Sequence, residues 1–247
     1  MQSIKRFIPL FFISLFFISF TCYAQDLENF ENEFSTPKKE IFDPLEGYNR
    51  SMTTFNDYVY TNILEPTAKG YAVVVPEPAR IGISNFIYNI KFPIRFVNNI
   101  LQFKLTNAVK ELGRFTVNST FGLLGFLDPA SENLGMEKYD EDFGQTLGFY
   151  GIGGGFHVVL PFLGPSNLRD MVGIVGDGYV NPLNATSAMN YKIPENSEQT
   201  LGISVFKAVN NVSLNLGKYE NIKKDAIDLY PFFRDTYNQK REKEIRE

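Results

Sequence analysis

The stretch from Asp140 to Asp170 constrains the fold most, because it combines many glycines and prolines with a dense load of large apolar residues. Glycine and proline break helices and strands, so we expect an irregular backbone here. Irregular backbone has unpaired N–H and C=O groups, and burying it in lipid is costly unless it lies inside the protein or lines a water-filled cavity. We therefore predict that this stretch walls a cavity or channel framed by the flanking helices. Its apolar residues are Phe149, Tyr150, Ile152, Phe156, Val158, Val159, Leu160, Phe162 and Leu163.

The length and composition exclude several classes of protein. The chain has 247 residues, enough to bury one sizeable core, and nothing in it requires a second domain. Its net charge of −4 argues against binding to nucleic acid, which needs a basic and clustered surface. A single cysteine excludes a disulfide framework within the chain and a cysteine-based zinc site. We expect neither a metal nor another cofactor.

The N-terminus is typical of an exported protein. Lys5 and Arg6 precede an apolar run over 7–20, which is too short to span a bilayer but suits the core of a signal peptide. Two cleavage sites compete: a cut after Ala24, giving a signal peptide over 1–24, or a cut before Cys22 followed by acylation of that cysteine. Residues 25–42 are polar and acidic without apolar periodicity, and we predict a disordered tether there.

Helical patterns account for most of the remaining chain, so the predicted fold class is all-α. Asp43, Pro44 and Glu46 are typical of a capped helix start, and Pro66 is expected to break the helix that follows. The expected helices cover 76–92, 96–115, 168–179, 201–216 and 218–246, with a solvated or fraying end over 239–247. Asp128 and Pro129 repeat the capping chemistry. Val158 to Leu160 is the best strand candidate and is too short to build a sheet.

Several residue patterns resemble functional sites but have simpler explanations. Gly151, Gly153 and Gly155 resemble a dinucleotide-binding loop, but Phe156 follows them and no strand precedes them. A catalytic group of His157, Ser166 and Asp170 lacks a nucleophile-elbow sequence, and an ion pair of Arg169 with Asp170 is favoured instead. Residues 140–142 lack the spacing of a calcium loop and suit a solvated helix start. The chain is not predicted to be an enzyme.

A set of ordered motifs resembles the MlaA/VacJ outer-membrane proteins of Gram-negative bacteria. The resemblance covers Asp43 to Arg241, leaving 242–247 as a charged tail. The motifs are Asp43-Pro-Leu-Glu-Gly-Tyr-Asn-Arg50, Phe55-Asn56, Val75-Pro-Glu-Pro-Ala-Arg80, Ser84-Asn85-Phe86, Phe96-Val97-Asn98, Gly113-Arg114-Phe115, Asn118-Ser119-Thr120, Asp142-Phe-Gly-Gln-Thr-Leu-Gly148, Leu160-Pro161, Gly164-Pro-Ser-Asn-Leu-Arg-Asp170 and Tyr230 to Tyr237.

The resemblance implies a fold, a place and a function. The domain over 43–241 would be a ring of amphipathic helices around a central amphipathic channel, lying in the inner leaflet of the outer membrane. It would remove mislocalised phospholipids from the outer leaflet and pass them to a periplasmic shuttle of the MlaC type, which maintains lipid asymmetry. The expected partners are phospholipids, a trimeric porin and that shuttle. The alternative is a periplasmic scaffold that docks a porin without conducting lipid.

Two departures from the family pattern concern the anchor and the central loop. The residues before Cys22 form a weak lipobox, which leaves lipidation open. The family's Gly-x-Gly-Pro-Gly-Pro-Tyr pattern appears here as Gly151-Ile-Gly-Gly-Gly-Phe-His157. Without the two proline rings, the loop has more backbone freedom.

A two-sided channel is the resulting site prediction, because a phospholipid has apolar chains and a charged head. Glycines of the central loop are expected to act as hinges. The apolar side and hinges are assigned to Phe149, Tyr150, Ile152, Gly153, Gly154, Phe156, Val159, Leu160 and Phe162. The polar side is assigned to Arg114 and Asn118. A charge introduced at Val159 is expected to block the passage of lipid.

Overall fold

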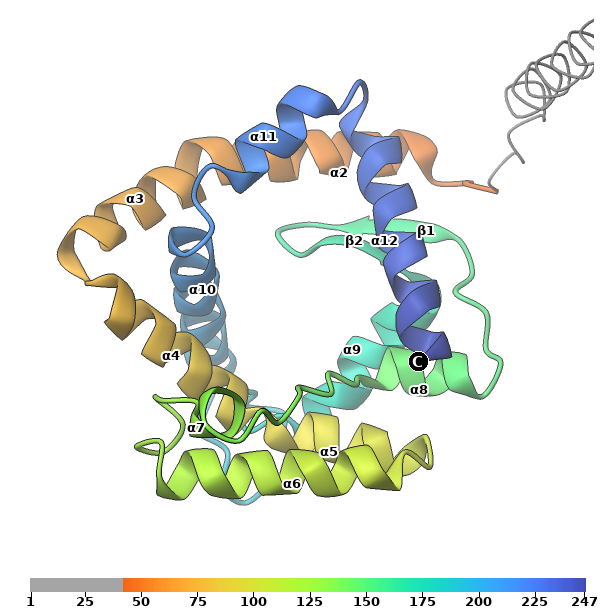
Figure 1. Ribbon diagram of the computed structural model, residues 1–247. Helices are drawn as coiled ribbons and strands as arrows, with labels where there is room; N and C mark the ends of the chain where they lie inside the picture. Colours follow the sequence, from red (N-terminus) through yellow and green to blue (C-terminus); the bar gives the residue numbers. More distant parts are fainter. Residues whose placement is uncertain (1–41) are drawn as a thin grey trace, which may run out of the picture. The chain divides into compact units, whose positions relative to one another are not determined.

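A computed structural model describes residues 42–247, and the unit Asp43–Glu247 forms a ring of helices with a β-hairpin reaching inward (Figure 1). The predicted signal peptide, Cys22 and the tether over 25–41 lie outside the described residues. The elements are α2 (Glu46–Val59), η2 (Tyr60–Leu64), α3 (Glu65–Val74), α4 (Glu77–Ile90), α5 (Phe92–Leu101), α6 (Leu105–Thr120), α7 (Pro129–Glu132), α8 (Phe143–Phe149), β1 (His157–Leu160), β2 (Gly164–Asn167), α9 (Leu168–Val180), α10 (Ser197–Ser213), α11 (Lys218–Asp225) and α12 (Leu229–Arg246).

The first side of the ring is one continuous helical rod made of α2, η2 and α3. The predicted break at Pro66 was wrong. Proline removes a backbone donor, and its ring crowds the carbonyl four residues back in a regular α-helix. The π-helical turn of η2 comes directly before this proline, and its wider hydrogen-bond spacing leaves room for the ring. The rod therefore passes Pro66 without ending.

The apolar stripe over 96–115 predicts one long helix, whereas the structure has two, α5 and α6, packed side by side. Phe103 lies in the left-handed region with φ +58, and Lys104 N–H donates to the Asn99 carbonyl at 2.9 Å, as in a Schellman turn. The adjacent Gln102 is buried and donates to a carboxylate and a hydroxyl from other elements. The turn contains neither glycine nor proline, so the apolar period gives no sign of it.

The hairpin of β1 and β2 is the addition to the predicted all-helical fold, and its antiparallel register pairs His157 with Asn167. Two asparagines seven residues apart on α2 satisfy backbone groups along β1 and just after it, where a two-stranded hairpin would otherwise leave them unpaired. The hydrogen bonds join Asn49 to His157 (3.0 Å) and Val159 (2.8 Å), and Asn56 to Leu160 (2.9 Å) and Phe162 (2.7 Å). The hairpin is thereby fixed to the ring wall.

The ring closes where α12 meets the start of α2. Asp43 was predicted to cap α2, but the helix begins at Glu46 without a side-chain cap. The Asp43 carboxylate instead accepts hydrogen bonds from Asn49 (3.1 Å) and from the Tyr230 hydroxyl on α12. Glu46 pairs with Arg50 at 2.8 Å and completes no capping box. Asp43 therefore bonds to Tyr230, 187 positions further along the chain, instead of to the start of α2. Local sequence does not encode such a contact.

The C-terminal end from Gln239 was predicted to be solvated or fraying, and it is exposed at most positions but stays helical. Helix α12 continues to Arg246 and packs against α8. A Cβ atom on Gly148 would lie 2.6 Å from the end of the Ile245 side chain, so α12 packs closely against α8 at this glycine. Arg241 lies in the same contact and is largely buried. The last turns of α12 are therefore part of the ring.

The distribution of polar and apolar residues is inverted relative to a typical soluble protein. The buried residues are polar more often than apolar, with Asn49, Asn99, Glu111 and Asn210 fully inaccessible. Large apolar side chains are exposed around the ring. They include Val73, Val74, Phe103, Leu105, Val109, Phe121, Leu123, Leu124, Val172, Val175, Leu201 and Val205. Apolar exposure on this scale marks a surface that contacts a membrane or another protein. No helix within 42–247 is both long and apolar enough to cross a bilayer.

Candidate functional site

A cavity of about 700 Å³ lies inside the ring, bounded by α4, α5, α9, α10, α12 and the hairpin. Its apolar lining comes from Ile87, Ile94, Leu160, Leu163, Pro165 and Ile174. Its charged lining comes from Lys91, Arg95, Asp140, Glu141, Asp142, Asp170, Asp177, Lys207, Lys240, Arg241 and Glu244. The predicted fold class is confirmed: the helices form a ring, and the space inside it has both apolar and charged lining.

The predicted apolar wall is divided by the structure. Leu160 lines the cavity, as does its neighbour across the turn, Leu163. Val159 is instead buried between the hairpin and α2, with only 3% of its surface exposed. The remaining apolar candidates lie outside this lining: Phe149, Tyr150, Ile152 and Phe162 are exposed, and Phe156 is half-buried.

The two loop glycines differ in their surroundings. A Cβ atom at Gly153 would meet nothing within 4 Å. At Gly154 it would lie 3.1 Å from the amide of Asn167, and the Gly154 carbonyl accepts a hydrogen bond from Arg169 N–H at 3.2 Å. Gly153 is therefore the freer of the two proposed hinge positions.

Arg114 and Asn118, the predicted polar wall, do not line the cavity. They lie in a buried network between α6 and α7, where the Arg114 guanidinium contacts Asp128 at 3.0 and 3.1 Å and Asn118 donates to the same carboxylate at 2.9 Å. Asp128 also caps α7 by accepting from Ser131 N–H. This network fixes α7 to α6, so the two predicted residues have a structural role in the geometry.

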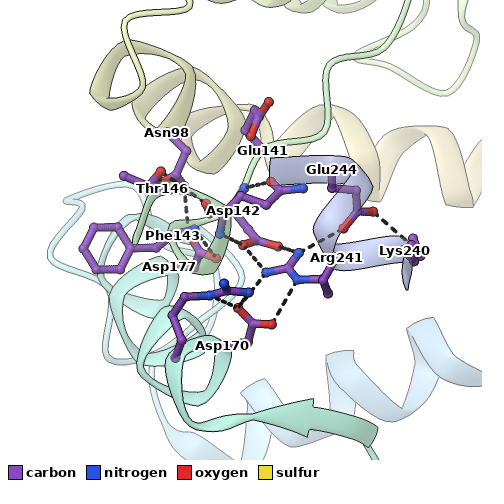
Figure 2. Close-up of polar contacts among 12 residues, drawn as sticks. Asn98, Glu141, Asp142, Phe143, Thr146, Asp170, Asp177, Lys240, Arg241 and Glu244 are labelled. Atoms are coloured by element: carbon purple, nitrogen blue, oxygen red, sulfur yellow. Dashed lines mark hydrogen bonds and ion pairs between the residues drawn. The ribbon is translucent and has the colours of Figure 1, made fainter. Parts of the chain in front are cut away.

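A second polar cluster lies on the cavity wall and centres on Arg241 (Figure 2). Its guanidinium contacts Asp142 at 2.7 and 2.8 Å, Asp170 at 3.0 Å and Glu244 at 3.1 Å. Asp142 also completes a capping box with Gln145 at the start of α8. The cluster thus joins α8, α9 and α12 through one cation. Residues 140–142 were predicted to be a solvated helix start. Asp142 does begin α8 and Asp140 is exposed, but Glu141 is buried and Asp142 is paired with Arg241.

Asp170 receives hydrogen bonds from several directions. Arg169 pairs with it at 2.9 Å, as predicted, and Arg241, Tyr237 and Asn167 also donate to it. Burial alone would raise the pKa of Asp170, but the hydrogen bonds from Arg241 and Tyr237 outweigh burial and hold the pKa below its ordinary value. Asp170 is therefore an ionised structural centre.

His157, the single histidine, forms no relay with Ser166 and Asp170. Neither ring nitrogen has a hydrogen-bond partner within 42–247, and the ring packs near Tyr230 and Tyr237 with centroids 6.0 and 5.9 Å away. Burial lowers the pKa of His157 to about 4, so the imidazole is neutral at neutral pH. The geometry contains no activated nucleophile at this position.

Asp177 on α9 is a cavity residue that sequence reasoning missed. Its Oδ1 atom accepts hydrogen bonds from the Asn98 amide (2.9 Å) and from Phe143 N–H (3.1 Å). Burial, followed by the nearby Asp142 carboxylate, raises the pKa of Asp177 to about 6. Asp177 lies on the polar face of α9, which periodicity alone assigns to bulk solvent.

Replacing Asp177 with asparagine should stabilise the protein in a pH-dependent way. Because the folded pKa is raised, stabilisation by Asp177 is present below about pH 4 and is lost as the pH rises through about 6. The asparagine oxygen can keep both hydrogen bonds to Oδ1. We expect Asp177→Asn to raise the free energy of unfolding by on the order of 1–3 kcal/mol at pH 7.5 and to leave it almost unchanged at pH 4.

Urea unfolding of the detergent-solubilised protein across this pH range checks that prediction. Asp140→Asn is the matched control, because the Asp140 side chain is 71% exposed. An equal gain for Asp177→Asn at both pH values would contradict the role of ionisation.

The chain is similar to proteins of one family over nearly all of its described part. A family model described as MlaA lipoprotein matches residues 41–244. An uncharacterized protein of Rickettsia bellii is 32% identical over 208 residues, covering 84% of this chain and 78% of that protein. Two proteins named intermembrane phospholipid transport system lipoprotein MlaA are also similar. The Haemophilus influenzae protein is 33% identical over 80% of this chain and 76% of its own length, and the Escherichia coli protein is 41% identical over 56% of each.

A solved structure has the same arrangement of helices. It is described as the structural basis for maintenance of bacterial outer membrane lipid asymmetry, and it matches with a TM-score of 0.70 and 30% sequence identity. The match covers 83% of this chain and 99% of that one. The similarity therefore extends around the whole ring and includes the elements that bound the cavity.

Proposed function

Because this chain belongs to the MlaA lipoprotein family, as its motifs predicted, we propose that it is the outer-membrane component of an intermembrane phospholipid transport system. It takes mislocalised phospholipids from the outer leaflet into the cavity and releases them to a periplasmic carrier of the MlaC type. A trimeric porin holds it in place. An N-terminal leader, cut either after Ala24 or before Cys22, directs export.

The observation that carries this proposal is the inverted distribution of residues, with polar side chains buried and many large apolar side chains exposed. Moving apolar surface from water into an apolar environment lowers its free energy by roughly 25 cal/mol per Å². Phe103 and Phe121 are 73% and 78% exposed, and Val73 is 87% exposed. Contact between such side chains and lipid acyl chains is favourable. Interfacial helices make this contact within a single leaflet. The proposed position is therefore the inner leaflet.

The amphipathic cavity supports lipid conduction rather than a scaffold alone. A scaffold that docks a porin needs a complementary outer surface but no internal space lined by both apolar and charged groups. Leu160 and Leu163 offer contacts for acyl chains, and Lys91 and Lys207 offer contacts for a hydrated head group. Gly153 supplies freedom for the loop before the hairpin to move as a lid.

Purified protein tests this proposal through its bound lipid and its hold on the membrane. We expect phospholipid to co-purify in a detergent extract, and we expect the protein to stay membrane-bound after high-salt and carbonate washing. A Cys22→Ala variant should behave in the same way, because the apolar exterior supplies the hold independently of any acyl anchor. Mass spectrometry of the mature N-terminus distinguishes cleavage after Ala24 from acylation at Cys22.

Two outcomes would contradict the proposal. Quantitative release of the Cys22→Ala variant by carbonate would mean that the helices do not enter the leaflet. Membrane retention without any bound phospholipid, combined with capture of a porin, would favour the scaffold alternative.

A further inference from the structure

Two lysines from different elements line the cavity. Lys91 lies at the junction of α4 and α5, and Lys207 lies on α10, which packs against α4. Neither forms an ion pair within 42–247, whereas Lys240 in the same cavity pairs with Glu244 at 3.5 Å. Burial and then the nearby Lys207 ammonium lower the pKa of Lys91 to about 8. The fold thus holds two like charges close together in a partly desolvated place.

Neutral polar groups extend this positive site along both helices. Ser84 lies seven residues before Lys91, two turns earlier on the same face of α4, and it lines the cavity. Asn211 lies four residues after Lys207, one turn later on α10, and it also lines the cavity. The hydroxyl and amide groups can donate hydrogen bonds to the same anion that the two ammonium groups attract.

The chemistry of these groups matches a phosphate. An ammonium group is a compact cation with three donors, and phosphate oxygens accept charge-assisted hydrogen bonds from it. Placing two ammonium groups side by side is unfavourable in the empty protein and becomes favourable when an anion lies between them. The Asp177 carboxylate lies near Lys91 and offsets part of this repulsion, but burial and Lys207 outweigh it, and neither lysine forms an ion pair within 42–247.

We propose that Lys91 and Lys207, with Ser84 and Asn211, bind the phosphate of a phosphodiester head group inside the cavity. This inference rests on the proposed function and names the part of the lipid that the cavity recognises. The acyl chains then extend toward Leu160 and Leu163 on the hairpin, across the same cavity. Free inorganic phosphate has the same anionic chemistry, so the experiment includes both sources.

Titration calorimetry of the full detergent-solubilised chain with glycerophosphoethanolamine and with inorganic phosphate tests the site. We expect saturable binding of the phosphodiester to the wild type, about a tenfold loss of affinity in Lys91→Gln or Lys207→Gln, and no saturable binding in the double variant. Lys240→Gln is the matched control, because it removes the same charge from a lysine that already has a carboxylate partner. Lys91→Arg keeps the charge and should keep most of the affinity.

A second readout separates loss of the site from loss of the fold. Because the two ammonium groups repel one another, Lys91→Gln should raise the melting temperature of the ligand-free protein while it weakens binding. A variant that binds less and also melts lower than the wild type would indicate a structural role and would overturn the assignment.

The remaining outcomes are distinguishable from failure of the proposed function. Wild-type affinity in the double variant overturns the inference, and phospholipid still bound to that variant leaves the transport function intact. Inorganic phosphate that binds as tightly as the phosphodiester and is not displaced by phospholipid micelles overturns the head-group assignment. Absence of phospholipid from the wild type contradicts the transport function, whereas lysine-dependent binding of the soluble phosphodiester would still establish the site.

Discussion

Replacing Arg241 with methionine should lower the free energy of unfolding by roughly 3 kcal/mol, because the change leaves two carboxylates without their shared cation. The Arg241 side chain is only 11% exposed and Asp170 only 6%, so solvent cannot substitute for the lost pairing. Asp170 keeps Arg169 as a partner at 2.9 Å, which places the loss at the low end of the range for a broken buried ion pair. The contact of α12 with α8 and α9 should weaken most.

The pH dependence of this loss identifies its cause. The pKa of Asp170 is depressed in the folded protein, so its stabilisation is present above about pH 4 and disappears as the pH falls through the folded pKa. The difference between the wild type and Arg241→Met should therefore shrink in acid. Urea unfolding at pH 7 and at pH 3 measures this difference in the free energy of unfolding at each pH.

Two further variants act as controls. Lys240→Met changes the preceding residue of α12, which is 71% exposed, and should alter stability by no more than about 0.5 kcal/mol. Arg241→Lys keeps the charge but loses the planar fork that reaches both carboxylates, and it should lie between the wild type and methionine. A loss for Arg241→Met that stays constant between pH 7 and pH 3 would contradict an electrostatic origin.

Local signals predicted those elements whose ends are set by neighbouring residues. Pro76 to Pro78 marked the start of α4, and Asp128 and Asp142 marked the starts of α7 and α8 by capping. The elements that were mispredicted depend on distant contacts instead. The Asp43 carboxylate accepts a hydrogen bond from Tyr230 instead of capping α2. The turn at Phe103 is stabilised by the buried Gln102, which donates to Glu141.

The cavity lining could not be predicted from periodicity for a physical reason. An amphipathic helix in a soluble protein turns its apolar face to the core, so a polar face is read as solvent-exposed. In this ring the polar faces of α4, α9 and α10 instead line an internal space, and Asp177, Lys91 and Lys207 lie on that lining. Apolar residues such as Val109 are exposed and lie outside the cavity lining. The sequence pattern of a helix is the same whether its polar face lies toward bulk solvent or toward an internal cavity. Only the closure of the ring distinguishes the two arrangements.

The central stretch illustrates the same limit at single residues. Its apolar character predicted a wall of the channel, and Leu160 does line the cavity. Strand alternation accounts for Val159, because successive residues of β1 point to opposite faces. Val159 therefore points away from the side that Leu160 presents to the cavity and is buried against α2.

Introducing aspartate at Leu163 should abolish lipid passage without unfolding the protein, and this is the largest functional effect that we expect. Leu163 lies at the tip of the hairpin, is 71% exposed and lines the cavity. An exposed substitution changes stability little. An ionised carboxylate in the path of acyl chains costs several kcal/mol when unpaired, and each 1.4 kcal/mol in a barrier is about tenfold in rate. Passage should fall by two orders of magnitude or more.

Two comparison variants separate blocked passage from damaged structure. Phe162→Asp places the same charge on the adjacent residue, which is 73% exposed, lies outside the cavity lining and packs against Phe55 with ring centroids 5.2 Å apart. It should leave passage within a few-fold of the wild type. Val159→Asp places the charge in the buried side of the hairpin, so it should reduce folded protein instead of blocking an intact channel.

The measurement is phospholipid in the outer leaflet of cells that carry each variant at matched protein levels. We expect accumulation with Leu163→Asp and near wild-type asymmetry with Phe162→Asp. If both aspartates gave the same accumulation, the cavity would not be the path, because only one of them lies within it. If Leu163→Asp kept wild-type asymmetry while the folded protein was present at normal levels, the hairpin tip would have no part in moving acyl chains, and lipid would have to pass by a route that avoids the interior of the ring.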